Sequence, residues 1–151
     1  MKFTFKKSER LNSKKVIEQL FDKKGRETNQ SVFLYPFRVS YVKKIVSDKS
    51  QVVSEDLPEI DSEQLITYDL RLTTSPPQIL ISVSKRFFKH AVDRNLIKRR
   101  TREAYRLNKH LLLQKPASQI PVYIAFVYIA KTIKDYAKIG KSMKVIFKKM
   151  V

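Results

Sequence analysis

The stretch FFKHAVDRNLIKRRTREAYRLNK, residues 87–109, has the periodicity of one amphipathic helix with a strongly basic side. One set of side chains recurs at steps of four and three residues, which places them on a single buried face. These side chains are Ile97, Thr101, Ala104, Asn108 and Leu111. A second face carries basic side chains four residues apart, and Arg99 and Arg100 widen it. Its members are Arg94, Lys98, Arg102 and Arg106.

The charge of this predicted helix is almost uncompensated. From Ser84 to His110 there are ten Lys and Arg side chains, against the two acids Asp93 and Glu103. Like charges four residues apart destabilise an isolated helix by about 0.2–0.5 kcal/mol per pair. An ordinary solvated face is the alternative interpretation, but such a face normally carries opposite charges as well. The planar guanidinium of Arg also suits phosphate, so the helix is predicted to lie against the phosphates of a nucleic acid.

The whole chain shows the same excess of positive charge. Its 151 residues include 32 Lys and Arg against 14 Asp and Glu, a net charge of +18, while 42% of the residues are hydrophobic. That hydrophobic fraction is ordinary for a globular protein, so we expect residues 1–151 to form a single domain with a real core. Such a charge surplus usually has a polyanionic partner, either a nucleic acid or an anionic membrane surface.

Several classes of protein are disfavoured by simple absences. No window reaches the roughly 18–20 apolar residues that a membrane-spanning helix needs, and the N-terminus lacks the apolar core of a signal peptide. There is no cysteine, which excludes disulfides and thiolate metal sites. His90 and His110 have no acid spaced to orient them, so surface histidines are expected. The sequence predicts a soluble, cytoplasmic protein without catalytic or metal-binding residues of its own.

The elements around the basic helix are expected in the order α-β-β-α-β-α, an α/β (α+β) sandwich of helices packed on a small central sheet. A first helix begins near Ser13, carries Val16, Ile17, Leu20 and Phe21 on its apolar side, and stops at Gly25. The later elements are a strand over 31–46, a possible short strand over 67–74, buried strands over 78–85 and 120–130, and a helix over 134–150. In that last helix, Tyr136, Ile139, Met143, Ile146 and Phe147 are expected to face inward.

The expected strand over 31–46 carries several aromatic side chains. Alternation places Ser31, Phe33, Tyr35 and Phe37 on one face, and Pro36 predicts a sheet edge or a bulge there. These aromatic side chains, like Phe21, are as consistent with a core as with a nucleic-acid platform unless their face lacks a covering helix.

An acidic segment separates the two halves of the chain. Residues 48–69 contain seven of the fourteen acids and a single lysine, without sustained periodicity. We expect a flexible acidic insertion there that stays away from a bound polyanion.

Residues 91–106, AVDRNLIKRRTREAYR, resemble the signature of the bacterial ribonuclease P protein component, Ala-Val-x-Arg-Asn-Arg-x-Lys-Arg-x-x-Arg-Glu-Ala. The matching residues are Ala91, Val92, Arg94, Asn95, Lys98, Arg99, Arg102, Glu103 and Ala104. The upstream segment SVSK and the pair Arg10–Leu11, followed ten residues later by Phe21, also fit. There are three departures. Leu96 stands where the signature has an arginine. The glycine that usually follows SVSK is absent, and the segment RFFKH after it is about one residue longer than usual. The acidic insertion is also longer than usual.

The resemblance implies a subunit bound to a catalytic RNA that removes the 5′ leader from precursor tRNA. The RNA, with Mg²⁺, would perform the hydrolysis, and the fold would contain a left-handed β-α-β crossover. Residues implied to bind the catalytic RNA are Lys85, Arg86, Arg94, Asn95, Lys98, Arg99, Arg102 and Arg106. A cleft between the first helix and the sheet would hold the leader, lined by Ile17, Phe21, Phe33 and Tyr35 and bordered by Asn95, Lys98 and Arg102. Neither DNA nor a membrane is expected as a partner.

Two other functions stay open from the residues alone. A ribosomal or RNA-chaperone protein could use the same basic helix with no linked reaction. An interfacial membrane protein could use its lysine-rich C-terminal helix, although a core role for the apolar side of that helix is simpler.

Overall fold

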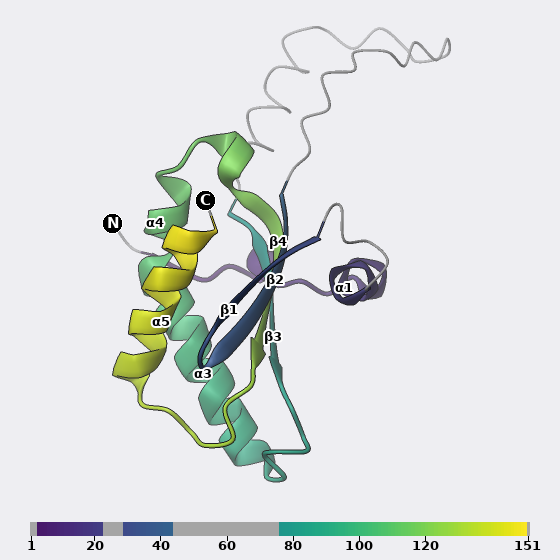
Figure 1. Ribbon diagram of the computed structural model, residues 1–151, viewed down its shortest axis with the longest axis vertical. Coiled ribbons are helices and arrows are strands. Elements are labelled where there is room, and N and C mark those ends of the chain that lie inside the picture. The colour runs from purple at the N-terminus through teal and green to yellow at the C-terminus, as the bar shows by residue number, and fades with distance from the viewer. Residues whose placement is uncertain (1–2, 23–28, 44–75, 151) are drawn as a thin grey trace, which may run out of the picture.

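The computed structural model describes residues 3–22, 29–43 and 76–150, and Figure 1 shows their arrangement. The helices are α1 (Lys14–Phe21), α3 (Ala91–Asn108), α4 (His110–Leu113) and α5 (Tyr136–Lys149), with short 3₁₀ turns η1 (Lys7–Glu9) and η2 (Ala117–Gln119). The strands are β1 (Asn29–Leu34), β2 (Phe37–Lys43), β3 (Gln78–Val83) and β4 (Pro121–Tyr128).

The strands form one four-stranded sheet in the order β1-β2-β4-β3. The pairs β1–β2 and β2–β4 are antiparallel, and β3–β4 is parallel. Because α3 connects the two parallel strands, the chain contains the expected β-α-β unit, whose handedness stays a prediction. Helices α3 and α5 cover one face of the sheet and α1 lies on the other (Figure 1). The predicted class, helices packed on a small mixed sheet, is confirmed.

The main core lies between the sheet and the pair α3 and α5. Phe37, Phe126 and Tyr128 of the sheet are fully buried there. Tyr105 of α3 makes edge contacts with Phe126 and Phe147, with ring centroids 6.3 and 6.1 Å apart. A smaller cluster on the other face holds α1 to the sheet, and its buried members are Leu11, Leu20 and Ala125.

The predicted buried face of the basic helix is confirmed in α3, apart from Leu111, which is half-buried beyond the end of the helix. Two of its members are polar, and both are satisfied within the helix. Thr101 Oγ1 donates to the Ile97 carbonyl at 2.8 Å, and Asn108 Nδ2 donates to the Ala104 carbonyl at 2.7 Å. A buried polar group that finds a partner one turn away carries little desolvation penalty.

The strand predicted over 31–46 is instead a hairpin, β1 and β2 joined by a turn at Tyr35–Pro36. The peptide bond of this turn is cis. Leu34 is paired with Phe37 and Phe33 with Arg38. Phe33 therefore lies on the face with α1, while Phe37 is buried on the other face. The alternation that suggested a shared face holds along one strand only and does not continue across a turn.

Two helix boundaries and the burial of one residue differ from the expected ones. Helix α1 ends at Phe21, whereas Gly25 lies outside the described residues. Helix α3 starts at Ala91 rather than residue 87. Tyr136, predicted to face inward, is 39% exposed at the start of α5. The acidic insertion at 48–69 and the possible short strand at 67–74 also fall outside the described ranges.

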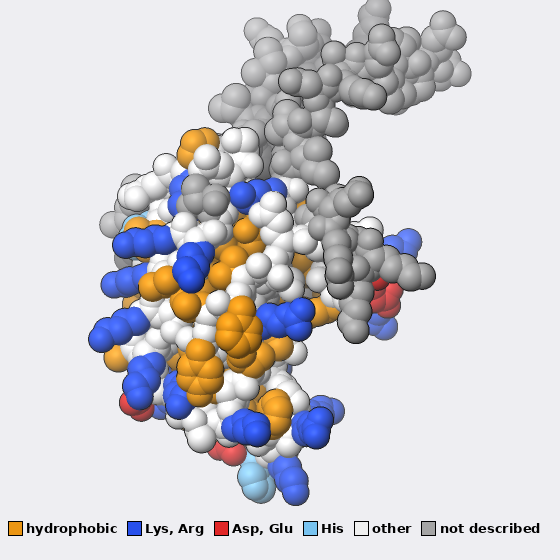
Figure 2. Space-filling model, viewed as in Figure 1, with side chains coloured by type: hydrophobic (Ala, Val, Ile, Leu, Met, Phe, Trp, Pro, Cys, Tyr) orange, Lys and Arg blue, Asp and Glu red, His pale blue; other side chains and the backbone are white. Residues whose placement is uncertain are grey.

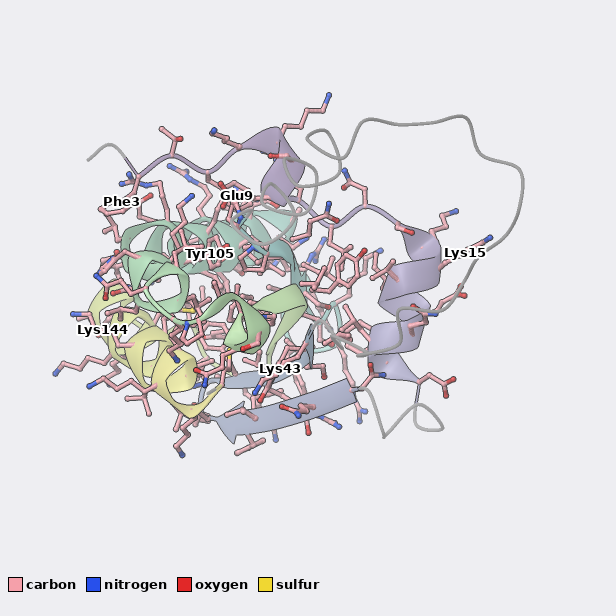
Figure 3. All side chains as sticks on the ribbon, turned by 90° about the horizontal axis from the view of Figure 1, so that it is seen from above. Phe3, Glu9, Lys15, Lys43, Tyr105 and Lys144 are labelled. Atoms are coloured by element: carbon pink, nitrogen blue, oxygen red, sulfur yellow. The ribbon has the colours of Figure 1, made fainter. Side chains whose placement is uncertain are left out.

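A buried ion pair fastens the N-terminal segment to the end of α3. Lys109 Nζ lies 2.8 Å from Glu9 Oε1 and donates to the Thr4 carbonyl at 2.6 Å. The backbone amide of Lys6 also donates to Glu9 Oε1, at 3.2 Å. Figure 3 shows Glu9 above α3, near the label of Tyr105.

Within the described part of the chain, no helix is long and apolar enough to cross a membrane.

Candidate nucleic-acid interface

Most basic side chains of α3 either hydrogen-bond to other segments of the fold or have no polar partner among the described residues. Three arginines donate to backbone carbonyls of other segments. Arg94 donates to Phe88 at 2.7 Å and to Lys89 at 2.6 Å. Arg100 donates to Lys134 at 2.8 Å, and Arg106 donates to Phe3. These cations connect α3 to the turn before it, to the loop before α5 and to the N-terminal segment.

Two cations of α3 have no such role. Arg99 is exposed and Lys98 is half-buried. Neither makes a hydrogen bond or an ion pair with any residue of 3–22, 29–43 or 76–150. Asn95 is also exposed, one turn before Arg99. An unpaired cation on a rigid helix can contact a phosphate without first breaking an internal contact.

Arg102 belongs to neither group. Its guanidinium lies 5.8 Å from the ring centroid of Phe5, and Arg10 lies 6.0 Å from the same ring. Two cations on one aromatic ring give a local concentration of positive charge held by cation–π contacts. The remaining predicted contacts, Lys85 and Arg86, are exposed in the turn after β3.

Arg106 is partly neutralised on the surface of the helix. Its Nε donates to Glu103 Oε2 at 2.9 Å, and a second guanidinium nitrogen contacts the other carboxylate oxygen. The hydrogen bonds from Arg106 lower the pKa of Glu103. Glu103 is therefore ionised at neutral pH and offsets the charge of this one arginine.

On the opposite face of the sheet, a cleft of about 480 Å³ lies between the end of α1 and the strands β1, β2 and β4. We call it the α1–sheet cleft. Its lining is Leu20, Phe21, Asp22, Asn29, Gln30, Ser31, Arg38, Ser40 and Val127. Phe21 is 46% exposed at this cleft, and Phe33 is 67% exposed on the same face of β1. Helix α1 covers only part of this face, so two large aromatic rings remain in solvent.

The structure does not bring all the predicted cleft residues together. Ile17 is half-buried and packs in the small cluster under α1. Tyr35 lies in the hairpin turn, where its carbonyl accepts a hydrogen bond from Ser142 Oγ at 3.0 Å and its ring lies 5.3 Å from Lys134 Nζ. Asn95, Lys98 and Arg102 belong to α3, which packs on the other face of the sheet, and none of them lines this cleft. Of the predicted residues, Phe21 lines the cleft and Phe33 lies on its face of the sheet.

Metal-binding geometry is not found in the described residues. Within 3–22, 29–43 and 76–150, no three side chains of His, Asp or Glu come together in a way that could hold a metal ion.

The comparison with known proteins decides the family. The family model for Ribonuclease P matches residues 5–151. The chain belongs to the ribonuclease P family. It is 32% identical over 145 residues to the ribonuclease P protein component of two strains of Porphyromonas gingivalis, covering 94% of this chain and 82% of each relative. It is also 43% identical over 61 residues to the ribonuclease P protein component of Chlorobaculum tepidum, covering 37% of this chain and 40% of that relative.

The ribonuclease P signature in this chain has both structural and exposed members. Arg94 holds the turn before α3, and Ala104 is fully buried against the sheet. Asn95 and Arg99 are instead exposed, and Lys98 is half-buried without an ion pair among the described residues. The signature therefore specifies the placement of the helix as well as the surface that it presents.

The polar lining of the α1–sheet cleft was not predicted from the sequence, and it consists of Asp22, Asn29, Gln30, Ser31, Arg38 and Ser40. Arg38 is exposed and lies directly opposite Phe33 in the β1–β2 register. Treating residues 31–46 as one strand hid this pairing, because the two residues then appeared five positions apart along the same strand. The dipeptide Tyr-Pro between two β-branched and aromatic runs was the available turn signal.

Proposed function

We propose that this chain is the protein subunit of the ribonucleoprotein endonuclease that removes the 5′ leader from precursor tRNA. The observation that carries the proposal is the ribonuclease P family match over residues 5–151. The subunit works in the cytoplasm, in complex with a catalytic RNA. Its two nucleic-acid surfaces are the outer side of α3 and the α1–sheet cleft.

Helix α3 binds the catalytic RNA through its outward side. Lys98 and Arg99 supply charges that have no partner among the described residues, and Asn95 supplies a neutral hydrogen-bonding group beside them. Lys85 and Arg86 extend the contact to the turn after β3. Arg94 contributes to the positive field, and both Arg94 and Arg106 hold α3 in place. Binding of this kind depends on phosphate charge, so it weakens steeply as salt rises.

The α1–sheet cleft holds the single-stranded leader. Exposed aromatic rings beside a cation bind single-stranded nucleic acid with little sequence preference, at about 1–3 kcal/mol per stacked base. Phe21 and Phe33 provide the rings, and Arg38 provides a cation directly opposite Phe33. The hydroxyls of Ser31 and Ser40 can donate to phosphate or ribose oxygens. This combination suits leaders of different sequence.

The bond-breaking step belongs to the RNA. Mg²⁺ would be held by RNA phosphates and would assist the hydrolysis that the RNA performs. The side chains of this protein bind and orient: α3 fixes the catalytic RNA, and the cleft fixes the leader relative to it. Holding a substrate in the reactive geometry can itself lower a barrier substantially.

The test is cleavage of a precursor tRNA by a bacterial ribonuclease P RNA at low Mg²⁺, with and without this protein. The expected result is restored 5′-leader removal with the protein present, and no cleavage by the protein alone. A protein that binds the RNA but leaves cleavage unchanged would instead be a general RNA-binding protein of the ribosomal or RNA-chaperone type.

A further inference from the structure

A second hollow lies between the outer side of α3 and the first turn of α5, and it shares no lining residue with the α1–sheet cleft. It measures about 490 Å³, within the roughly 300–1,000 Å³ of small-ligand sites. We call it the α3–α5 hollow. Its lining is Phe5, Leu96, Arg99, Arg100, Arg102, Glu103, Arg106 and Tyr136. An apolar and aromatic surface is thus surrounded by four arginines and one glutamate.

The apolar part of the hollow includes the residue that departs from the ribonuclease P signature. Leu96 is half-buried where the signature has an arginine. Tyr136, on α5, is 39% exposed, although its position on the apolar side of that helix predicted burial. Phe5 adds a half-buried ring from the N-terminal segment. Three apolar groups from distant parts of the chain therefore lie together among cations. A surface that bound only phosphate would not need these apolar groups.

The arginines around this hollow are largely held in place. Arg100 is fixed by its 2.8 Å hydrogen bond to the Lys134 carbonyl, and Arg106 by Glu103 and the Phe3 carbonyl. The guanidinium of Arg102 lies over Phe5 at 5.8 Å. Side chains that are already ordered lose less conformational freedom when a ligand binds. Arg99 alone has no partner among the described residues, so its donors are available to a phosphate.

We propose that the α3–α5 hollow binds one unstacked nucleotide of the RNA partner. Its base lies against Leu96, Tyr136 and Phe5, and its phosphate is bound by Arg99. Proteins commonly recognise RNA through unpaired bases that lie against aromatic rings and guanidinium planes. The inference rests on the proposed function only in taking RNA as the partner. It assigns to Leu96 a positive role, because an arginine there would replace the apolar surface with a charge.

The test measures how much a single base increases the affinity of the protein for a ribose-phosphate chain. The probes are an abasic ribose-phosphate heptamer and the same heptamer with a single adenine at its centre, so both carry the same charge. All variants contain Phe33→Ala, which removes the exposed ring beside the α1–sheet cleft, on the same face of the sheet. In this background the adenine is expected to tighten binding about fivefold or more, within the range found for one stacked base.

Adding Tyr136→Ala or Leu96→Arg is expected to reduce this base-dependent ratio to about one. Adding Tyr136→Phe, which keeps the ring, should preserve it. Arg99→Gln should weaken binding of both probes and flatten the salt dependence while leaving the ratio intact. Circular dichroism of each variant verifies that these partly exposed positions have not altered the fold.

Two outcomes would overturn the inference. A ratio near one before any further substitution would mean that the hollow binds phosphate alone. If the affinity ratio of the two probes stays well above one in both Tyr136→Ala and Leu96→Arg, the base binds elsewhere. Tighter binding of both probes by Leu96→Arg would then reflect only the added charge. Stimulation of precursor tRNA cleavage is measured separately, so failure of the subunit function and failure of the nucleotide site give different results.

Discussion

At the residue scale, neighbouring arginines of α3 have different tasks although the sequence presents them as one run. Arg99 and Arg100 are adjacent, yet Arg100 donates to the Lys134 carbonyl while Arg99 is exposed without a partner among the described residues. A guanidinium already satisfied by a carbonyl has fewer donors left for phosphate. RNA affinity and protein stability should therefore separate at these two positions.

Arg99→Gln is expected to weaken binding to the catalytic RNA and to lower the salt slope by about one unit, the value of one lost phosphate contact. Its unfolding midpoint in urea should stay unchanged, because the side chain holds nothing in the described fold. Arg94→Gln is the matched control, since it removes two hydrogen bonds to the turn before α3 and should lower that midpoint. An unaltered salt slope in Arg99→Gln would refute its assignment to phosphate.

The two exposed aromatic residues of the hairpin also differ. Phe33 is 67% exposed on the face with the α1–sheet cleft, whereas Tyr35, 53% exposed, lies in the turn beside Lys134. Phe33→Ala should raise the KM for leader-bearing precursor tRNA by about fivefold or more, the loss expected for one stacked base. Tyr35→Ala should raise it less. The measurement is steady-state cleavage by the reconstituted complex, with a leaderless tRNA as competitor to control for general RNA binding. A larger effect at Tyr35 would mean that the leader follows the hairpin turn instead of the cleft.

At the element scale, the N-terminal segment is part of the α3 surface and not a free basic tail. The pair Glu9–Lys109 connects residues 100 positions apart, and both side chains are almost fully buried. The same segment carries Phe5, which lies under Arg102. The position of one helix face therefore depends on a short turn at the start of the chain.

Glu9→Ala should destabilise the protein by about 3–5 kcal/mol, because it leaves the buried ammonium of Lys109 without its counter-charge. Urea unfolding measures this loss. Glu103→Gln is the matched control, since it removes a carboxylate from an exposed i,i+3 pair and should have little effect. The double variant Glu9→Ala/Lys109→Met should recover part of the stability. Equal effects of Glu9→Ala and Glu103→Gln would contradict the assignment of the buried pair.

At the scale of the whole molecule, the net charge of +18 is the dominant feature. Figure 2 shows blue Lys and Arg side chains in a row along α5, beside hydrophobic side chains over the β1–β2 hairpin. In Figure 3, Lys144 marks this α5 side and Lys15 the α1 side, so positive charge occurs on both sides of the sheet. Repulsion of this extent favours expanded states unless anions are bound.

Multivalent anions should therefore raise the melting temperature of the free protein. A ligand that binds only the native state stabilises it by RT ln(1 + [L]/Kd), about 2.7 kcal/mol at a hundred times Kd. The comparison is thermal unfolding in sodium phosphate and in sodium chloride at equal ionic strength, which controls for general screening. Identical melting temperatures would show that the native state has no anion site strong enough to matter.

The sequence by itself determined the class of partner, the basic helix, its buried face and the family. The positive charge and the buried face follow from composition and from periodicity within one element, because burial of one helix side is repeated every three or four residues. The family, and RNA as the partner, follow instead from the signature at residues 91–106. Only the tertiary structure decided which cations are free, that residues 31–46 form a hairpin, and that Leu96 and Tyr136 share a hollow. Those outcomes depend on contacts between distant segments, such as Glu9 with Lys109 and Arg100 with Lys134, and no local pattern records such contacts.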